Sequence, residues 1–205
     1  MKEYPQFAAS ADDVVALLAS QLLARIVTID PDKIPRVGLH VFIHDGLTVE
    51  MHFATDDAQL EDVRRGSPVV IEVDETLSTS PSHWIDEANA TNADQFYRCA
   101  SLWGTTSIVT DPDAIATHLR GILAKYQPEG RHSAVTASAE YYREAIAYLN
   151  VVRVTGTSMR TKFKLGQSTD PAKREQILAR LRERGGPLDG RTAALISDAK
   201  ARVKD

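Results

Sequence analysis

Apolar residues occupy every second position in two consecutive segments near the middle of the chain. They are Val37, Leu39, Val41 and Ile43 in residues 36–44, and Leu47, Val49, Met51 and Phe53 in residues 47–54. A period of two is typical of β-strands with one buried face. Further strands are predicted from apolar, strand-like runs, at residues 25–29, 68–73, 96–109 and 150–165.

A period near 3.6 predicts helices at both ends of the chain and between the strands. The segment 111–126 has the clearest start, because Asp111 can cap the helix and Pro112 suits its first position. The other helices are expected at residues 11–24, 57–65, 139–149 and 172–184, while residues 78–94 are expected to be irregular. Strands dominate, so the class is α+β, mainly β: a small barrel with attached helices.

Composition limits where the protein acts. The chain of 205 residues is 43% hydrophobic, enough to bury a core, and we expect a domain at residues 1–168 with a helical extension at 169–205. The net charge of −4 gives no global attraction to nucleic acid or to anionic membranes. No apolar run reaches the ~20 residues of a membrane span, and the N-terminus lacks the features of a signal peptide. A cytoplasmic protein is the plain interpretation, and Cys99, the single cysteine, excludes an internal disulfide.

The hairpin around Asp45 and Gly46 allows a prediction of register. A three-residue loop at residues 44–46 pairs Ile43 with Leu47, so that the two apolar stripes share one face and Gly46 takes a left-handed conformation. On the opposite face, Gly38 and Ala54 then leave a shallow floor, bordered by Arg36, Phe42 and His52. This floor is either a subunit interface or solvated sheet face, or the seat of a planar ligand.

The last predicted strand ends in a cluster of positive charge. Arg160, Lys162 and Lys164 alternate along one strand face, and Lys173 follows at the start of a helix. Two or three such side chains could localise an anion through charge-assisted hydrogen bonds. The alternative is that they are lysines of an exposed strand edge, which discourage aggregation. We call the segment 160–167 the basic corner.

Other candidate residues have two interpretations each. Trp103 could stack on a ligand or pack in the core or a subunit interface, and Trp84 lies in the long polar loop, where function is common. His40 and His52 share a face only diagonally and lack further ligands, so no metal site is predicted. The sequence contains no glycine-rich phosphate loop, nucleophile elbow or evident helix-turn-helix, and therefore identifies no catalytic residue and makes nucleic acid an improbable partner.

The order of these segments resembles the FMN-binding split-barrel superfamily, which includes pyridoxamine 5′-phosphate oxidase-like proteins. The likeness rests on TVEMHFATDDAQLEDVRRGSPVVIEVDE, on YRCASLWGTTSIVTDPDAIATHLRGILAKY and on the ending KFKLGQ, and spans residues 10 to 180. Within that group the chain is most similar to PaiB-like FMN-binding proteins, some of which are described as negative transcriptional regulators. The resemblance implies a six-stranded, Greek-key split barrel with peripheral helices and a C-terminal helical tail, in a homodimer that binds flavin between its subunits.

The chain departs from that family at the phosphate turn. Split-barrel oxidases usually place Arg or Lys there, whereas this chain has Asp56 and Asp57, and it has Ser168 where relatives tend to have Asn. The basic corner would then supply the missing charge. The residues expected to bind the cofactor are Arg36, Gly38, His52, Phe53, Ala54, Thr55, Trp84, Trp103, Lys162, Lys164 and Gln167.

Two functions follow from the resemblance. The first is an oxidoreductase in which bound FMN, with haem or deazaflavin F420 as less favoured alternatives, performs the chemistry on a small-molecule substrate or accepts electrons from a nicotinamide donor. The second is a ligand-sensing or regulatory module that uses the same cleft without turnover. The sequence identifies neither the substrate nor the electron acceptor.

Overall fold

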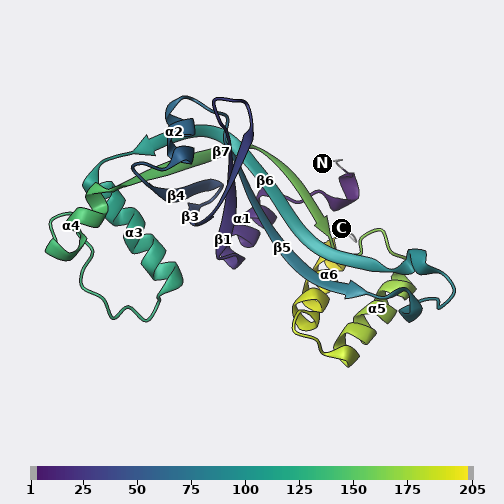
Figure 1. The fold of residues 1–205 in the computed structure, drawn as a ribbon. Helices are drawn as coiled ribbons and strands as arrows, with labels where there is room; N and C mark the ends of the chain where they lie inside the picture. Colours follow the sequence, from purple (N-terminus) through teal and green to yellow (C-terminus); the bar gives the residue numbers. More distant parts are fainter. Residues whose placement is uncertain (1–3, 203–205) are drawn as a thin grey trace. The chain divides into compact units, whose positions relative to one another are not determined.

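A computed structural model describes residues 4–202 (Figure 1). In that range seven β-strands and six α-helices are joined by short 3-10 helices at residues 5–7, 82–84 and 90–92. The strands are β1 (Leu23–Ile29), β2 (Pro35–Val41), β3 (Ile43–Asp45), β4 (Thr48–Ala54), β5 (Val70–Ser80), β6 (Asp94–Val109) and β7 (Leu149–Lys164). The helices are α1 (Ala11–Ser20), α2 (Ala58–Arg64), α3 (Pro112–Tyr126), α4 (Glu140–Ala147), α5 (Pro171–Arg184) and α6 (Asp189–Arg202).

The strands form a sheet in the order β2-β1-β5-β6-β7-β4-β3. The mainly β class with attached helices is therefore confirmed. The predicted number of six strands is wrong, because the segment expected as one strand over residues 36–44 is interrupted at Phe42. The order also has two ends, β2 and β3, where a closed barrel would have none.

The predicted hairpin register is wrong for the same reason. Phe42 is fully buried, so the chain breaks there and β2 pairs with β1 instead of β4. The short β3 pairs with β4 across a two-residue turn, with Asp45 opposite Thr48. Gly46 has a φ of 54°, the left-handed conformation expected of it. The observed β3–β4 pairs are Ile43↔Glu50, His44↔Val49 and Asp45↔Thr48.

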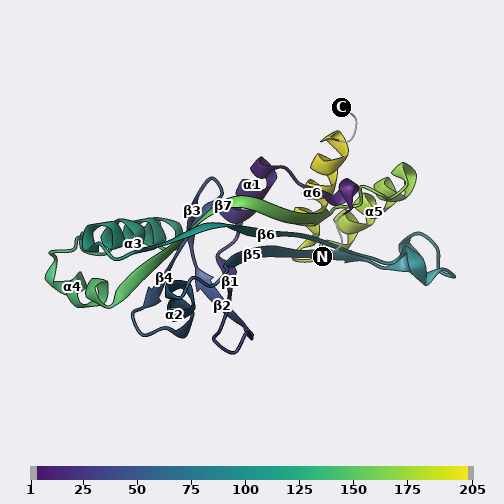
Figure 2. The same ribbon diagram turned by 90° about the horizontal axis from the view of Figure 1, so that it is seen from above.

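The chain divides into two compact units, which we describe separately. Unit 2 comprises residues 11–73 and 101–159 and contains α1 to α4. The side chain of Asp111 accepts a hydrogen bond from the backbone N–H of Ala114, which caps α3 as the sequence predicts. Helices α3 and α4 lie beside each other (Figure 2). Their buried residues pack with a loop valine and with β7 in a cluster of Ile115, Ala116, Val135, Ile146 and Val151.

Within the described residues, unit 1 comprises 4–10, 74–100 and 160–202. Helices α5 and α6 pack on each other there through apolar residues that include Leu181 and Ile196. Asp189, at the start of α6, is buried and accepts hydrogen bonds from Arg184 and Ser78. These contacts join the helices to β5. No helix within residues 4–202 is long and apolar enough to cross a membrane.

Candidate functional site

Strand β4 carries the histidine that the sequence singled out. Val49, Met51 and Phe53 are buried on one face of β4, so Glu50 and His52 project from the other face. His52 there meets His118 of α3: the His52 Nδ1 and His118 Nε2 atoms are 3.0 Å apart. A histidine from a helix is thus brought against the histidine of the strand.

On the same face of β4, His118 also contacts a carboxylate, that of Glu50. His118 Nδ1 lies 3.1 Å from Glu50 Oε2, and Arg153 of β7 donates through Nε to Glu50 Oε1 at 2.7 Å. The hydrogen bond from His118, with help from Arg153, holds the pKa of Glu50 below its usual range in spite of partial burial. Burial, with smaller effects from His118 and His40, lowers the pKa of His52 to about 4. At neutral pH the cluster therefore contains a carboxylate and a neutral His52.

Residues of unit 2 that the structure describes line at least two pockets. The first, which we call the Ser67 pocket, has a volume of about 510 Å³ and is formed by the end of α2, the segment that follows it, and β6. Its lining residues include Arg64, Ser67, Thr106 and Ser107. The second, the His118 pocket, has a volume of about 360 Å³ and is lined by Ile43, His44, Asp45, Thr48, Glu50, Ala114, Thr117, His118 and Arg153.

The floor expected around Gly38 is not open. A Cβ atom added at Gly38 would lie 1.9 Å from Oε1 of Gln59, so the glutamine side chain fills that space. The buried Gln59 donates hydrogen bonds to the carbonyl oxygens of Ile26 and Arg36. Glycine is needed here because another side chain of the protein approaches the backbone. The Arg36 side chain is 3.1 Å from the carboxylate of buried Asp62.

The strand end after His52 is held by its own neighbours. Phe53 is buried against the ring of His40, at 4.4 Å between centroids, and Ala54 ends the strand. The Thr55 hydroxyl donates to the carbonyl oxygen of Tyr148 at 2.9 Å. Both acids of the following turn have partners as well: Asp56 accepts from the Tyr148 hydroxyl at 2.5 Å, and Asp57 accepts from the N–H of Gln59 at 2.7 Å. The turn therefore uses its carboxylates for local structure.

The basic corner lies in unit 1, and its side chains have partners within that unit. Lys164 forms an ion pair with Asp94. The Lys162 Nζ atom is 5.6 Å from the ring centres of both Tyr4 and Tyr97, and the hydrogen bond with Tyr97 raises the pKa of Lys162. Gln167 folds back on the corner, accepting from the N–H of Leu165 and donating to the carbonyl of Phe163.

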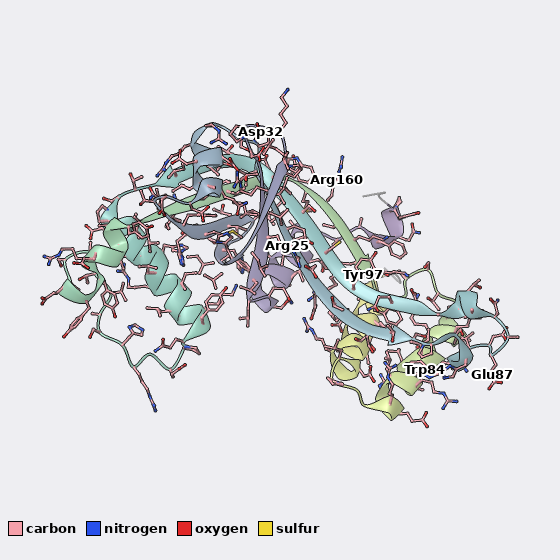
Figure 3. The ribbon with its side chains drawn as sticks, viewed as in Figure 1. Arg25, Asp32, Trp84, Glu87, Tyr97 and Arg160 are labelled. Atoms are coloured by element: carbon pink, nitrogen blue, oxygen red, sulfur yellow. The ribbon has the colours of Figure 1, made fainter. Side chains whose placement is uncertain are left out.

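The two tryptophans lie in different units. Trp84, which is labelled in Figure 3, belongs to unit 1. The Arg184 guanidinium lies 4.6 Å from the centre of its ring, and Gln176 donates a hydrogen bond to its backbone carbonyl oxygen. Trp103 lies on β6 in unit 2 and is half-buried. Of the other predicted residues, unit 2 contains Arg36, Gly38, His52, Phe53, Ala54 and Thr55, and unit 1 contains Lys162, Lys164 and Gln167.

Sequence reasoning missed His118, Gln59 and Arg64. His118 sits within the apolar stripe of α3, three residues after Ile115, and a histidine at such a position was the only local signal. Its partner Glu50 is 68 residues away in the chain, so no spacing rule connects them. Among the described residues, no group of three or more His, Cys, Asp or Glu side chains is arranged to hold a metal ion.

Comparison with solved structures identifies relatives in fold. The chain is 15% identical to the conserved hypothetical protein Rv2991 from Mycobacterium tuberculosis, with a TM-score of 0.61 over 83% of this chain and 94% of that one. It is 22% identical to an FAD and heme binding protein from Mycobacterium smegmatis, with a TM-score of 0.65 over 85% of this chain and 80% of that one. It is 17% identical to the flavocytochrome Anf3 from Azotobacter vinelandii, with a TM-score of 0.63 over 76% of this chain and 68% of that one. At these identities the likeness shows a shared fold.

The amino-acid sequence was also compared with curated proteins and with protein-family models. No curated protein matches the chain significantly. The family model described as pyridoxamine 5′-phosphate oxidase matches residues 10–162, about three quarters of the chain. The chain therefore belongs to the pyridoxamine 5′-phosphate oxidase-like family.

Proposed function

We propose that this protein is an FMN-binding oxidoreductase that acts as a homodimer of split barrels. The observation that carries the proposal is the family match over residues 10–162. Two proteins of the same fold are described as a flavocytochrome and as an FAD and heme binding protein, which supports a flavin-type cofactor. A bound flavin supplies the hydride or electron transfer, so the protein has only to bind and orient the ring and to admit a small substrate or a nicotinamide donor.

The Ser67 pocket fits the phosphate end of such a cofactor. Arg64 contributes a guanidinium that is one-third exposed and forms an ion pair with Glu61. Its Nη1 atom also donates to the carbonyl oxygen of Thr55 at 3.1 Å. Thr106 and Ser107 add hydroxyl-bearing residues to the same wall, while the Ser67 hydroxyl already donates to the carbonyl oxygen of Pro68. A guanidinium with neighbouring hydroxyl donors is a suitable phosphate site. The acids of the preceding turn have local partners, which reduces their repulsion of an anion.

Matched variants test this assignment against the basic corner. Arg64→Ala should weaken FMN binding by about 10- to 100-fold, the value of one charge-assisted contact, and should leave riboflavin, which lacks the phosphate, nearly unaffected. Lys162→Ala removes a cation of the basic corner and serves as the comparison. If the corner holds the phosphate, Lys162→Ala produces the selective loss of FMN and Arg64→Ala does not. Titration of both ligands into both variants distinguishes the two sites.

A second copy of the chain is proposed to cover one face of β1 and β2. The register places Arg25 opposite Leu39 and Val27 opposite Val37, all on the face turned away from the core. Leu39 is 56% exposed there and Val37 60%, a large apolar surface for a single chain to leave in water. Sedimentation at micromolar concentration should give a dimer for the native chain and a monomer for Leu39→Lys. Tyr141→Lys on exposed α4 is the control, and a monomeric native chain would contradict the assembly.

An absorption spectrum tests the cofactor itself. Purified protein should show flavin bands that bleach when NADH or NADPH is added. A Soret band would indicate haem, the second cofactor named for relatives in fold. A bound flavin that resists every reductant would favour the ligand-sensing alternative. Protein that binds none of these cofactors would refute the proposal.

A further inference from the structure

Three side chains of unit 2 form a hydrogen-bonded chain that ends at His52. Glu50 and His52 lie two residues apart on the same face of β4, and His118 of α3 bridges them with its two ring nitrogens. The His118 side chain is 1% exposed, so water does not compete for these contacts. Each ring nitrogen of a neutral imidazole is either a donor or an acceptor. Once the acceptor at one end of this hydrogen-bonded series is known, the position of the proton on each ring follows.

Arg153 and Glu50 fix that end. Arg153 can only donate, and its Nε–H occupies Glu50 Oε1, which leaves Oε2 facing His118. An ionised carboxylate can only accept, so His118 carries its proton on Nδ1. This placement of protons holds for the neutral form of His118, in which one ring nitrogen donates and the other accepts. Neutral His118 therefore offers a lone pair at Nε2, and His52 must donate to it from Nδ1.

We infer that Glu50 and His118 hold His52 in the tautomer protonated at Nδ1, so that His52 Nε2 presents a lone pair to the N–H or O–H group of a ligand. Within residues 4–202 the Nε2 atom has no hydrogen-bond partner. It is also not among the described side-chain atoms that are both buried and unpartnered, so it remains accessible. Glu50 and His118 are positioning residues in this arrangement, and His52 is the residue that contacts the ligand. The ligand role, though not the tautomer, rests on the proposed function.

The ligand group selected at this position depends on the fact that His52 Nε2 accepts a hydrogen bond and cannot donate one. A lone pair accepts from the single ring N–H of an oxidised isoalloxazine, or from a hydroxyl or amine of a substrate. It repels groups that can only accept, such as a carboxylate or phosphate oxygen. The chain of contacts thus selects a donor group at this position.

The tautomer can be measured in the absence of any ligand. Long-range 1H–15N correlation spectra of the labelled full chain at pH 8 separate protonated from unprotonated ring nitrogens, and His52→Gln and His118→Gln assign the two rings. We expect a protonated Nδ1 and an unprotonated Nε2 for both residues. A protonated Nε2 on His52 would overturn the inference, whether or not the protein binds flavin.

Glu50→Gln should move the proton from Nδ1 to Nε2 on both His118 and His52. Arg153 would keep the amide oxygen of the new side chain, which turns its NH2 group toward His118 Nδ1. His118 must then accept at Nδ1 and donate from Nε2, and His52 must carry its proton on Nε2. Glu183→Gln, the same change on the exposed face of α5, should alter neither ring. An unchanged His52 tautomer in folded Glu50→Gln would overturn the role assigned to Glu50, and if that variant does not fold, the native spectrum still decides.

A titration with oxidised FMN tests the ligand role. Glu50→Gln should bind FMN about tenfold more weakly, because one neutral hydrogen bond is lost and a donor then faces a donor. Glu183→Gln should bind like the native chain. Equal affinity in a Glu50→Gln variant whose tautomer has reversed would show that His52 does not touch the flavin. If even the native chain binds no FMN, the proposed function fails while the spectra still decide the tautomer.

Discussion

Replacing Asp189 with Asn should destabilise unit 1 far more than its small change in shape suggests. The Asp189 carboxylate is 2% exposed and accepts from Arg184 Nε at 2.8 Å, Arg184 Nη2 at 2.6 Å, Ser78 Oγ at 2.5 Å and the Gly186 N–H at 2.8 Å. Removing one partner of a buried ion pair costs about 3–5 kcal/mol. The Arg184 side chain is 35% exposed and can regain water, and the amide oxygen of Asn still accepts, so we expect about 2–3 kcal/mol.

Urea denaturation measures this loss. Trp84, with Arg184 against its ring, reports on unit 1 by fluorescence once Trp103 has been replaced with Phe. Glu183→Gln is the matched control, since it makes the same chemical change in an ion pair whose side chains are 69% and 49% exposed and should cost less than about 0.5 kcal/mol. Equal losses in the two variants would refute the idea that burial of the carboxylate sets its contribution.

Two further predictions concern unit 2. Burial lowers the pKa of His52 to about 4 from its ordinary 6.5, so the unfolded chain binds this proton first as the pH falls. The free energy of unfolding should therefore fall by about 1–2 kcal/mol between about pH 6.5 and pH 4, after allowance for partial exposure, and an equal fall in His52→Gln would contradict this cause. A Cβ at Gly104 would lie 1.9 Å from the carbonyl oxygen of Thr155, so Gly104→Ala should cost about 3 kcal/mol in a urea titration. Gly46→Ala, which meets only an unfavourable φ of 54°, should cost about 1 kcal/mol, and the reverse ranking would refute the clash.

Local patterns predicted most of the elements. The alternation over residues 47–54 corresponds to β4, and Asp111 with Pro112 marked the start of α3. Both signals depend only on residues close together in the sequence, so the predicted elements agree with those of the structure. The first helix was predicted four residues too long, because Leu22 and Leu23 continue its apolar spacing while the chain already enters β1.

The pairing of strands could not be predicted in the same way. Val37 and Leu39 alternate as regularly as Val49 and Met51, yet the first two are exposed and the second two are buried. Alternation shows that a strand has an apolar face, but it does not show what covers that face. The break in the predicted strand falls at fully buried Phe42, between β2 and β3, and the sequence around it carries no turn signal.

Of the histidine cluster at the candidate site, the sequence predicted only the part that lies on β4. His52 was identified, but its environment comes from His118, 66 positions later in the chain. Gly38 was correctly recognised as a place of close approach, whereas the approaching group is Gln59 of the same chain. Such contacts depend on tertiary packing, and a single sequence gives no spacing from which to infer them.

The interleaving of the two units in the chain has a consequence for biosynthesis. Each of β5, β6 and β7 runs from one unit into the other, and unit 1 is assembled from three separate segments, the last of which begins at Arg160. Unit 2 has all of its strand residues only when synthesis has passed residue 159, and unit 1 only when it has passed Lys164. Pairings between distant residues therefore form late and slowly. A stop codon at residue 169 would leave Ser78 and the surrounding strand segments without the helices that bury them, so the truncated product should be a substrate for proteases.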